Sequence, residues 1–264
     1  MEKITSEFVS GYEFYKLADH SFCPRYPINL NPHNVKENDL VFVNLDSLSD
    51  FLNILSSNPP KNKFRLITHN SDGGFNQQHL DRLLPYVNEI YPINCALKDT
   101  PIIKKIPLGF VDSVYKPHHK FKTIREEKNS KSIFAYMNFA INTNYSKRID
   151  CQQAFDDKEW VLSQSNIPPE DFYRQLARSR YVLSPEGTGI DCHRIYESIF
   201  LDAVPIIKSG FLDDFYERMP LLIVDSWADV TEDFLVENYS FHFERLKKWK
   251  ADNPKWSSAE FWIT

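Results

Sequence analysis

The sequence lacks any long apolar run, and this absence limits what the chain can be. Nowhere in its 264 residues do about 18 apolar residues follow one another, the length that a transmembrane helix requires. The first residues, Met1 to Phe8, also lack the basic-then-apolar order of a secretory signal peptide. We therefore expect a soluble, cytoplasmic protein with no integral membrane segment.

Cysteine is scarce, and the cysteines that are present do not cluster. No C-x-x-C pair occurs, and no histidine stands at the spacing of a zinc finger. This pattern gives little support to a disulfide framework or to a zinc site. We expect free thiols in a reducing compartment at Cys23, Cys95, Cys151 and Cys192.

The chain also lacks an excess of positive charge. Its 31 Lys and Arg residues stand against 36 Asp and Glu residues, a formal net charge of −5. Nucleic acids and anionic membranes usually require a basic face, so neither is an expected partner. With 42% hydrophobic residues the composition is that of a globular protein, and the length suits one large or two small domains.

Apolar runs alternate with segments of helical periodicity along most of the chain. This alternation predicts a small α/β sheet in the first part of the chain and, after residue 131, a parallel sheet covered by helices on both faces. The first 35 residues, which contain three prolines, are left unassigned. We expect strands at 39–45, 64–68, 89–93, 102–108, 132–137, 160–162, 180–183, 204–207 and 221–224, and helices at 47–55, 77–84, 145–155, 169–179, 192–202, 212–218 and 230–250.

One strongly polar stretch, residues 116–131, interrupts the alternation and has no apolar period. Such a stretch is typical of a linker. We therefore expect a first domain at 1–118 and a second at 119–264, the second ending in a helical tail.

Two of the only seven glycines, Gly187 and Gly189, lie between an expected strand and an expected helix. Asp191 has the residue type and position of the helix N-cap. A glycine loop that leads into a helix N-terminus presents backbone N–H groups to an anion at close range. The expected ligand is a phosphate.

Arg194 and Glu197 follow in that helix, three residues apart and therefore on one face, with about 4.5 Å of rise between them. Arg194 is placed to meet a diphosphate, and Glu197 to accept hydrogen bonds from ribose hydroxyls. The same spacing also suits an ordinary surface ion pair, so the pattern alone leaves both interpretations open.

The segment as a whole resembles a known family. Ser184-Pro-x-Gly-x-Gly-x-Asp-x-x-Arg-x-x-Glu197, followed by Ala203-Val-Pro-Ile-Ile207, is similar to the donor-binding segment of exostosin-like glycosyltransferases. Phe134 to Phe139 and the basic helix start at Ser146-Lys-Arg148 resemble the opening of that family's donor domain. The resemblance covers residues 132–226. It implies that Arg148 contacts the diphosphate, and that the donor also contacts Ser184, Pro185, Gly187, Thr188, Gly189, Arg194 and Glu197.

The resemblance also implies a fold and an activity. The fold is GT-B, two Rossmann-like domains that face a cleft, with the nucleotide sugar bound by the second domain and a glycan acceptor by the first. The activity is that of an inverting hexosyl- or pentosyltransferase with a UDP-sugar donor, as in soluble bacterial or viral forms. No Asp-x-Asp motif is present, which agrees with a site that needs no metal and no cofactor.

The first domain offers candidates for the general base. His69 and Asp72 follow the strand expected at 64–68, and ligands of open α/β sheets bind beyond such strand ends. An inverting transfer needs a base that removes the proton of the acceptor hydroxyl, and either side chain suits this role. A turn that merely caps the next helix is the equal alternative.

Two other functions compete with a glycosyltransferase. A non-catalytic nucleotide- or carbohydrate-binding protein with a degenerate transferase fold stays open, because the base is unassigned. An NAD-dependent oxidoreductase is disfavoured, since its glycine fingerprint follows the first strand of a domain and this glycine loop follows the third. A P-loop kinase is excluded, because the chain contains no G-x-x-x-x-G-K-[ST] motif.

Overall fold

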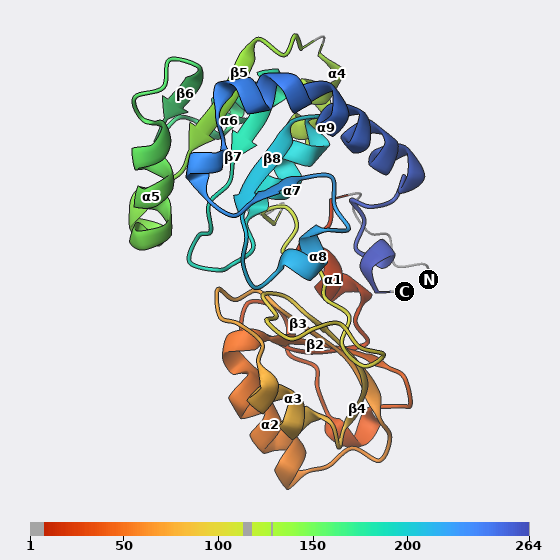
Figure 1. Cartoon of the computed structure of the whole chain (residues 1–264). Helices are drawn as coiled ribbons and strands as arrows, with labels where there is room; N and C mark the ends of the chain where they lie inside the picture. Colours follow the sequence, from red (N-terminus) through yellow and green to blue (C-terminus); the bar gives the residue numbers. More distant parts are fainter. Residues whose placement is uncertain (1–7, 113–117, 128, 264) are drawn as a thin grey trace. The chain divides into compact units, whose positions relative to one another are not determined.

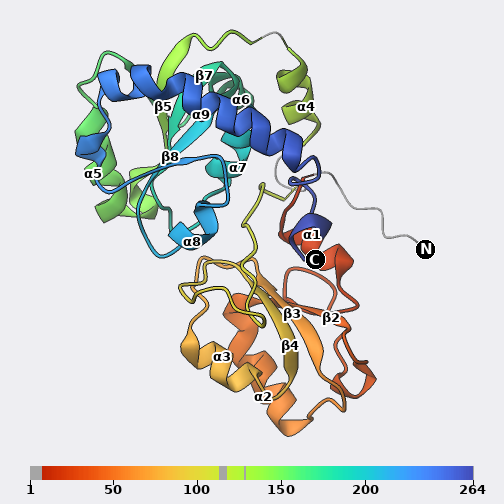
Figure 2. The ribbon, with the colours of Figure 1, turned by 45° about the vertical axis from the view of Figure 1, so that its right-hand side comes forward.

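A computed structural model describes residues 8–112, 118–127 and 129–263, which form two compact units (Figures 1 and 2). The first unit contains the described residues up to Gly109 together with those from Lys255 onward. The second unit runs from Phe110 to Pro254. Each unit has its own hydrophobic core and its own sheet.

This division differs from the domain boundary expected at 118/119 and from the assignment of the tail to the second domain. The structure divides the chain before Phe110, and the end of the chain returns to the first unit. There Trp256 and Ala259 are buried, and the Val9 N–H donates to the Ser257 carbonyl. The packing of the C-terminal residues against the first unit is a tertiary contact, so it was not predictable from the polar composition of residues 116–131.

The sheet of the first unit is fully parallel, with strand order β1-β2-β3-β4. Three expected strands and both expected helices are confirmed, while α1 and β1 arise in the unassigned first 35 residues. The elements are α1 (Gly11–Leu17), β1 (His20–Phe22), β2 (Leu40–Asn44), α2 (Leu48–Ser57), β3 (Phe64–His69), α3 (Gln77–Leu83) and β4 (Val87–Pro92).

Helices α2 and α3 lie side by side on one face of this sheet (Figures 1 and 2). The buried residues of α2 recur at i, i+3, i+4 and i+7, and they join β2 and β3 in one core: Leu48, Phe51, Leu52 and Leu55. The strand expected at 102–108 is wrong, because this segment forms only a single bridge, from Ile103 to Ile90 of β4.

The sheet of the second unit is also fully parallel, with strand order β6-β5-β7-β8-β9. All five strands and all five helices expected here are confirmed, with boundaries shifted by one or two residues in most cases. They are β5 (Ile133–Asn138), α5 (Tyr145–Phe155), β6 (Val161–Gln164), α6 (Pro169–Arg178), β7 (Ser179–Leu183), α7 (His193–Phe200), β8 (Val204–Lys208), α8 (Asp213–Tyr216), β9 (Leu222–Val224) and α9 (Glu232–Asp252).

Helices cover both faces of this second sheet. Ala135 and Met137 of β5 join the core that contains residues of α5 and α9. Tyr136, which lies between them and points to the other face, packs against Phe172 of α6 with ring centroids 6.1 Å apart. The expected doubly covered parallel sheet is therefore confirmed in this unit.

A further helix, α4 (His119–Glu126), occupies most of the stretch expected to be a linker. Phe121 and Ile124 are buried, and the Phe121 ring packs on Tyr173 of α6 with centroids 4.1 Å apart. Two apolar residues three apart are enough to anchor a two-turn helix, so the linker prediction is wrong over these residues. Residues 116, 117 and 128 lie outside the described ranges. Among the described helices, none combines the length and the apolarity that a bilayer crossing demands.

We predict that Gly11→Ala destabilises the protein by about 1–3 kcal/mol. Alanine normally stabilises a helix relative to glycine, but here its Cβ would overlap Asn70 Oδ1 and come within 2.9 Å of His69 Nδ1. Chemical denaturation measures the change in the free energy of unfolding. Gly73→Ala is the matched control, because its nearest atom is the movable Ser71 Oγ at 3.1 Å. A stabilised Gly11→Ala variant would contradict this account of the packing.

Candidate functional site

The candidate site lies at the carboxyl ends of the strands of the second unit. The first strand of this unit, β5, pairs with β6 on one side and with β7 on the other. The chain therefore changes direction across the sheet at β5, and such switch points are where open α/β sheets bind ligands. The loops that follow β5 and β7 meet at this point.

Hydrogen bonds join the loop after β7, residues 184–192, to the loop after β5, residues 139–144. Asn144 Nδ2 donates to the Gly187 carbonyl at 2.8 Å, and Thr188 Oγ1 donates to the Thr143 carbonyl at 3.2 Å. Within the glycine loop, the Gly187 N–H donates to the Gly189 carbonyl at 3.1 Å. Gly187, Thr188 and Gly189, which were expected to contact the nucleotide-sugar donor, thus form a loop that hydrogen bonds within the chain hold in place.

Arg148 of α5 joins the same two loops. Its side chain is 7% exposed, and Nε donates to the Glu186 carbonyl at 2.9 Å while Nη1 donates to the Ala140 carbonyl at 2.7 Å. A Cβ on Gly187 would lie 2.8 Å from Nη2, so a glycine is needed for this close approach. Arg148 positions the loop, and its direct contact with a diphosphate stays a prediction.

Arg194 of α7 lies beside Arg148. Arg194 is 9% exposed, and its Nε donates to the Asn138 carbonyl at 3.1 Å. Both guanidinium groups lie over the Phe139 ring, at 5.5 Å for Arg148 and 5.4 Å for Arg194. Burial, followed by the neighbouring charge of Arg194, lowers the pKa of Arg148. We refer to Arg148 and Arg194 as the arginine pair.

The arginine pair carries charge that the described part of the chain does not neutralise. Within that part, no carboxylate forms an ion pair with either guanidinium. Arg194 Nη1 is buried and has no hydrogen-bond partner among the described residues. Buried charges are normally paired, so this arrangement indicates a site for an anion.

The surface ion pair considered for Arg194 and Glu197 is therefore not present. Glu197 is 2% exposed and lies in the interior, where its charge adds to burial in raising the pKa of Tyr173. It lines neither of the two pockets described below. The structure does not bring Glu197 into an open site, and its contact with ribose stays a prediction.

Asp191 is not the N-cap of α7, as the sequence suggested. The cap is Cys192, and Asp191 precedes it, 4% exposed. Its carboxylate accepts hydrogen bonds from the Cys192 N–H at 2.8 Å, from the Tyr216 hydroxyl at 2.9 Å and from the Tyr196 hydroxyl. Because this carboxylate already lies at the start of α7, attraction of an anion must come from the arginine pair rather than from the helix dipole.

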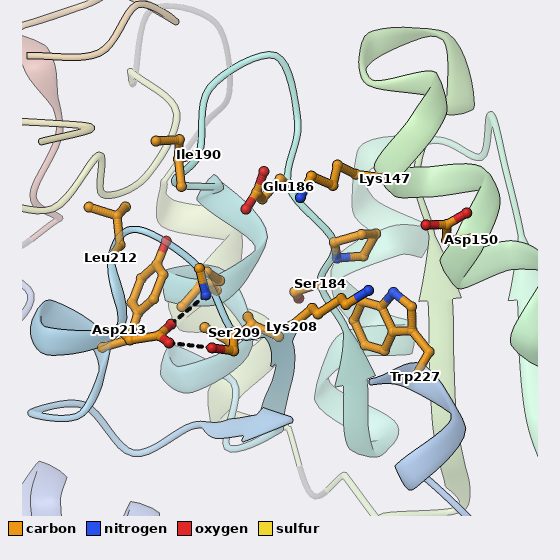
Figure 3. A pocket seen from close by; sticks show the side chains of 15 residues that line it. Lys147, Asp150, Ser184, Glu186, Ile190, Lys208, Ser209, Leu212, Asp213 and Trp227 are labelled. Carbon is orange, nitrogen blue, oxygen red and sulfur yellow. Dashed lines mark hydrogen bonds between the residues drawn. The ribbon is translucent and has the colours of Figure 1, made fainter. Parts of the chain in front are cut away.

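A narrow pocket opens beside the glycine loop (Figure 3). Ser184 and Pro185 line it, as do Lys147 of α5 and Trp227. Its far wall is the turn after β8, where Asp213 accepts hydrogen bonds from Ser209 Oγ at 2.5 Å and from the Gly210 N–H at 2.8 Å. Its volume of about 30 Å³ has room for a water molecule but not for a nucleotide.

The turn after β8 was missed in the sequence, although Gly210 marks it. This glycine follows the strand expected at 204–207 by three residues, and it was one of only seven. The carboxylate of Glu186 lies 3.2 Å from the position that a Cβ of Gly210 would occupy. The glycines that follow β7 and β8 were therefore the available signal.

A second cavity, of about 680 Å³, lies between the loops that follow β5 and β6. This volume is within the range of about 300–1,000 Å³ that is usual for small-molecule sites. We call it the β5–β6 cavity. Met137, Phe139 and Ile141 form its apolar wall. Its remaining lining is mostly amide and hydroxyl side chains: Asn142, Gln152, Ser163, Gln164, Ser165 and Asn166. None of these six polar residues was singled out in the sequence.

The two candidates for the general base lie at the end of β3 in the first unit. His69 is 1% exposed, its Nε2 donates to the Pro107 carbonyl at 3.2 Å, and its Nδ1 accepts from the Asn70 N–H at 2.8 Å. Both ring nitrogens are therefore engaged by the chain. Asp72 is exposed.

The described residues contain no group of three or more His, Cys, Asp or Glu side chains that could hold a metal ion. The four cysteines are free and buried. Independence from a metal stays a prediction.

Comparison with known proteins rests on the fold, because no family model and no curated protein matches the sequence. The structure is similar to that of an α,α-trehalose-phosphate synthase (UDP-forming) from Burkholderia vietnamiensis, with a TM-score of 0.51 and 9% identity over 88% of this chain and 75% of that chain. For the corresponding enzyme from Burkholderia xenovorans, the TM-score is 0.46 and the sequence identity 11%, over 87% of this chain and 75% of that chain. For the pneumococcal O-GlcNAc transferase GtfA in complex with UDP and GlcNAc, the TM-score is 0.40 and the sequence identity 11%, over 87% of this chain and 56% of that chain.

The similarity to the Burkholderia vietnamiensis enzyme shows the fold. The chain has the GT-B type of α/β fold, built from two Rossmann-like units with parallel sheets, and this part of the prediction is confirmed. The narrower resemblance to exostosin-like enzymes stays a prediction. The contacts in the site come from this chain alone.

We predict that Arg148→Gln loosens the glycine loop. Loss of two charge-assisted hydrogen bonds to loop carbonyls is expected to speed amide hydrogen exchange across residues 184–192 by about tenfold or more. Exchange followed by mass spectrometry measures this rate. Lys147→Gln is the matched control, since Lys147 is the exposed neighbour and makes no hydrogen bond to this loop within the described residues. Equal exchange in the two variants would show that Arg148 does not hold the loop.

Proposed function

We propose that this chain is a glycosyltransferase that moves a sugar from a nucleoside diphosphate, a UDP-sugar, to a hydroxyl of a glycan acceptor. The observation that carries the proposal is the buried arginine pair at the switch point of the second unit, with Arg194 Nη1 lacking a partner among the described residues. A diphosphate supplies the negative charge that this site lacks. The GT-B fold is consistent with this activity.

The same pair accounts for the chemistry of the leaving group. When the bond between the sugar and the diphosphate breaks, negative charge develops on the departing phosphate oxygen. Two guanidinium groups that are already held in place stabilise this charge without reorganisation and without a metal ion. We therefore propose a metal-independent transfer in the cytoplasm, with a hexose or pentose as the transferred group.

Two observations support UDP as the nucleotide of the sugar donor. The resemblance of residues 184–207 to exostosin-like enzymes implies UDP. The Burkholderia vietnamiensis enzyme that shares the fold is, by its name, UDP-forming, which agrees with that choice.

For an inverting transfer we propose Asp72 as the general base in preference to His69. The basic nitrogen of His69, Nδ1, already accepts the Asn70 N–H, and its Nε2 proton is donated to Pro107. Asp72 is an exposed carboxylate on the turn that follows β3. It is therefore accessible to an acceptor hydroxyl without a rearrangement of the strand end.

Arg194→Gln should weaken UDP binding by about tenfold to a hundredfold, because a hydrogen bond to a charged group is worth about 1.5–3 kcal/mol. Isothermal titration calorimetry with UDP measures the effect, and circular dichroism checks that the fold is kept. Arg178→Gln is the matched control, as Arg178 is an exposed arginine of α6 in the same unit. Equal UDP affinity in both variants, or tighter binding of NAD than of UDP by the unaltered protein, would overturn the proposal.

Asp72→Asn is expected to lower transfer or donor hydrolysis by about a hundredfold or more while leaving UDP affinity unchanged. Release of UDP from a panel of UDP-sugars, assayed with and without EDTA, measures the rate. Asp50→Asn is the control, because Asp50 is also exposed in the first unit but lies on α2. Full activity of Asp72→Asn would exclude it as the base. UDP binding without turnover of any donor by the unaltered protein would instead support the non-catalytic alternative.

A further inference from the structure

The lining of the β5–β6 cavity indicates what kind of group it accepts. Its polar side chains are amides and hydroxyls, and among the described residues no lysine, arginine, aspartate or glutamate lines it. Such a lining suits an uncharged ligand that both donates and accepts hydrogen bonds. The apolar wall formed by Met137, Phe139 and Ile141 suits a flat ring.

The cavity adjoins the arginine pair. Phe139 lines the cavity, and the guanidinium groups of both arginines lie over its ring. Ala140 lines the cavity as well, and its carbonyl accepts a hydrogen bond from Arg148. A ligand with an anionic part at the arginines and an uncharged ring in the cavity therefore fits across these two residues.

One amide in the cavity has its oxygen turned toward a buried hydroxyl. Asn138 Nδ2 donates to the Tyr136 hydroxyl oxygen at 2.7 Å, and the Tyr136 hydroxyl donates to Gln164 Oε1 at 3.4 Å. Tyr136 is fully buried, and burial raises its pKa to about 12, so it keeps the proton that it donates. The oxygen of the Gln164 amide is thereby used as an acceptor by Tyr136.

The nitrogen of the same amide is left for a ligand. Within the described residues Gln164 Nε2 makes no hydrogen bond, and this nitrogen can only donate. As long as Asn138 donates to the Tyr136 hydroxyl, rotation of the Gln164 amide would bring a second donor to that oxygen and leave the buried proton without an acceptor. The hydrogen-bond chain from Asn138 through Tyr136 thus presents Gln164 to the cavity as a donor.

We propose that the β5–β6 cavity binds the base of the donor nucleotide and that Gln164 selects a base with a keto oxygen, uracil or guanine, over the amino bases cytosine and adenine. This inference rests on the proposed function and names the chemistry of its donor. Uracil O4 and guanine O6 accept a hydrogen bond, whereas cytosine N4 and adenine N6 donate one. An amide NH2 group that is fixed as a donor forms a hydrogen bond with uracil O4 or guanine O6. Opposite cytosine N4 or adenine N6 it would face a second donor and form no hydrogen bond.

Calorimetric titration of the full chain with UDP, CDP, GDP and ADP tests this selection. We expect the unaltered protein to bind UDP about tenfold or more tightly than CDP, the factor that corresponds to one well-placed hydrogen bond against a mismatched one. Gln164→Leu removes the donor, and Tyr136→Phe removes the hydroxyl that orients it. Both substitutions should reduce the ratio of UDP to CDP affinity to about threefold or less.

The ratio is informative because UDP and CDP differ only at positions 3 and 4 of the base. A substitution that only disturbs the fold weakens both nucleotides and leaves their ratio unchanged. Gln153→Leu is the matched control, since Gln153 is the exposed neighbour of the lining residue Gln152 on α5 and does not line the cavity. It should leave the ratio as in the unaltered protein.

The outcomes separate this inference from the function on which it rests. If the unaltered protein binds UDP and CDP equally, or prefers CDP or ADP, the selection by Gln164 is refuted while the nucleotide site stands. The same holds if Gln164→Leu weakens UDP and CDP by the same factor. If none of the four nucleotides binds, the proposed function itself fails, and the base site with it.

Discussion

The burial of two arginines side by side, without an ion-pair partner among the described residues, is the constraint on which the site depends. Like charges that share one aromatic ring, Phe139, repel each other, and burial removes the water that would screen them. The chain compensates in part with backbone carbonyls, from Ala140 and Glu186 to Arg148 and from Asn138 to Arg194. These carbonyls carry dipoles and not charges, so the site keeps its positive charge for an anionic ligand.

The loops around the site follow from the same constraint. The carbonyl of Glu186 can face Arg148 only if the glycine loop bends close to the guanidinium, and Gly187 makes room for this by lacking a Cβ. The loop after β5 also directs the Ala140 carbonyl to Arg148, and Phe139 and Ala140 of the same loop line the β5–β6 cavity. One set of contacts therefore builds the anion site and one wall of the neighbouring cavity.

The parts of the fold that were predictable from the sequence are those with local causes. Helix α5 begins and ends at the expected residues, because its start is set locally: Asn144, directly before the helix, caps it by accepting a hydrogen bond from the Lys147 N–H. The linker prediction failed at α4, where a polar composition hid the packing of Phe121 on Tyr173 of α6 and the burial of Ile124. Asp191 has the residue type of an N-cap, but the hydroxyls of Tyr196 and Tyr216 hold its carboxylate one position before the cap. Both errors arose where distant residues outweighed a local preference.

The sequence by itself determined the two parallel α/β units, the glycine loop after β7 and the arginines that accompany it, because strand and helix periods and glycine positions are local properties of the chain. Only the tertiary structure decided that Arg148 and Arg194 meet on Phe139, that Glu197 lies in the interior, and that a cavity with an oriented Gln164 adjoins the pair. The physical reason is that these arrangements join strands, loops and helices far apart in the chain. Burial and hydrogen-bond partners are set by such packing and not by spacing along the sequence.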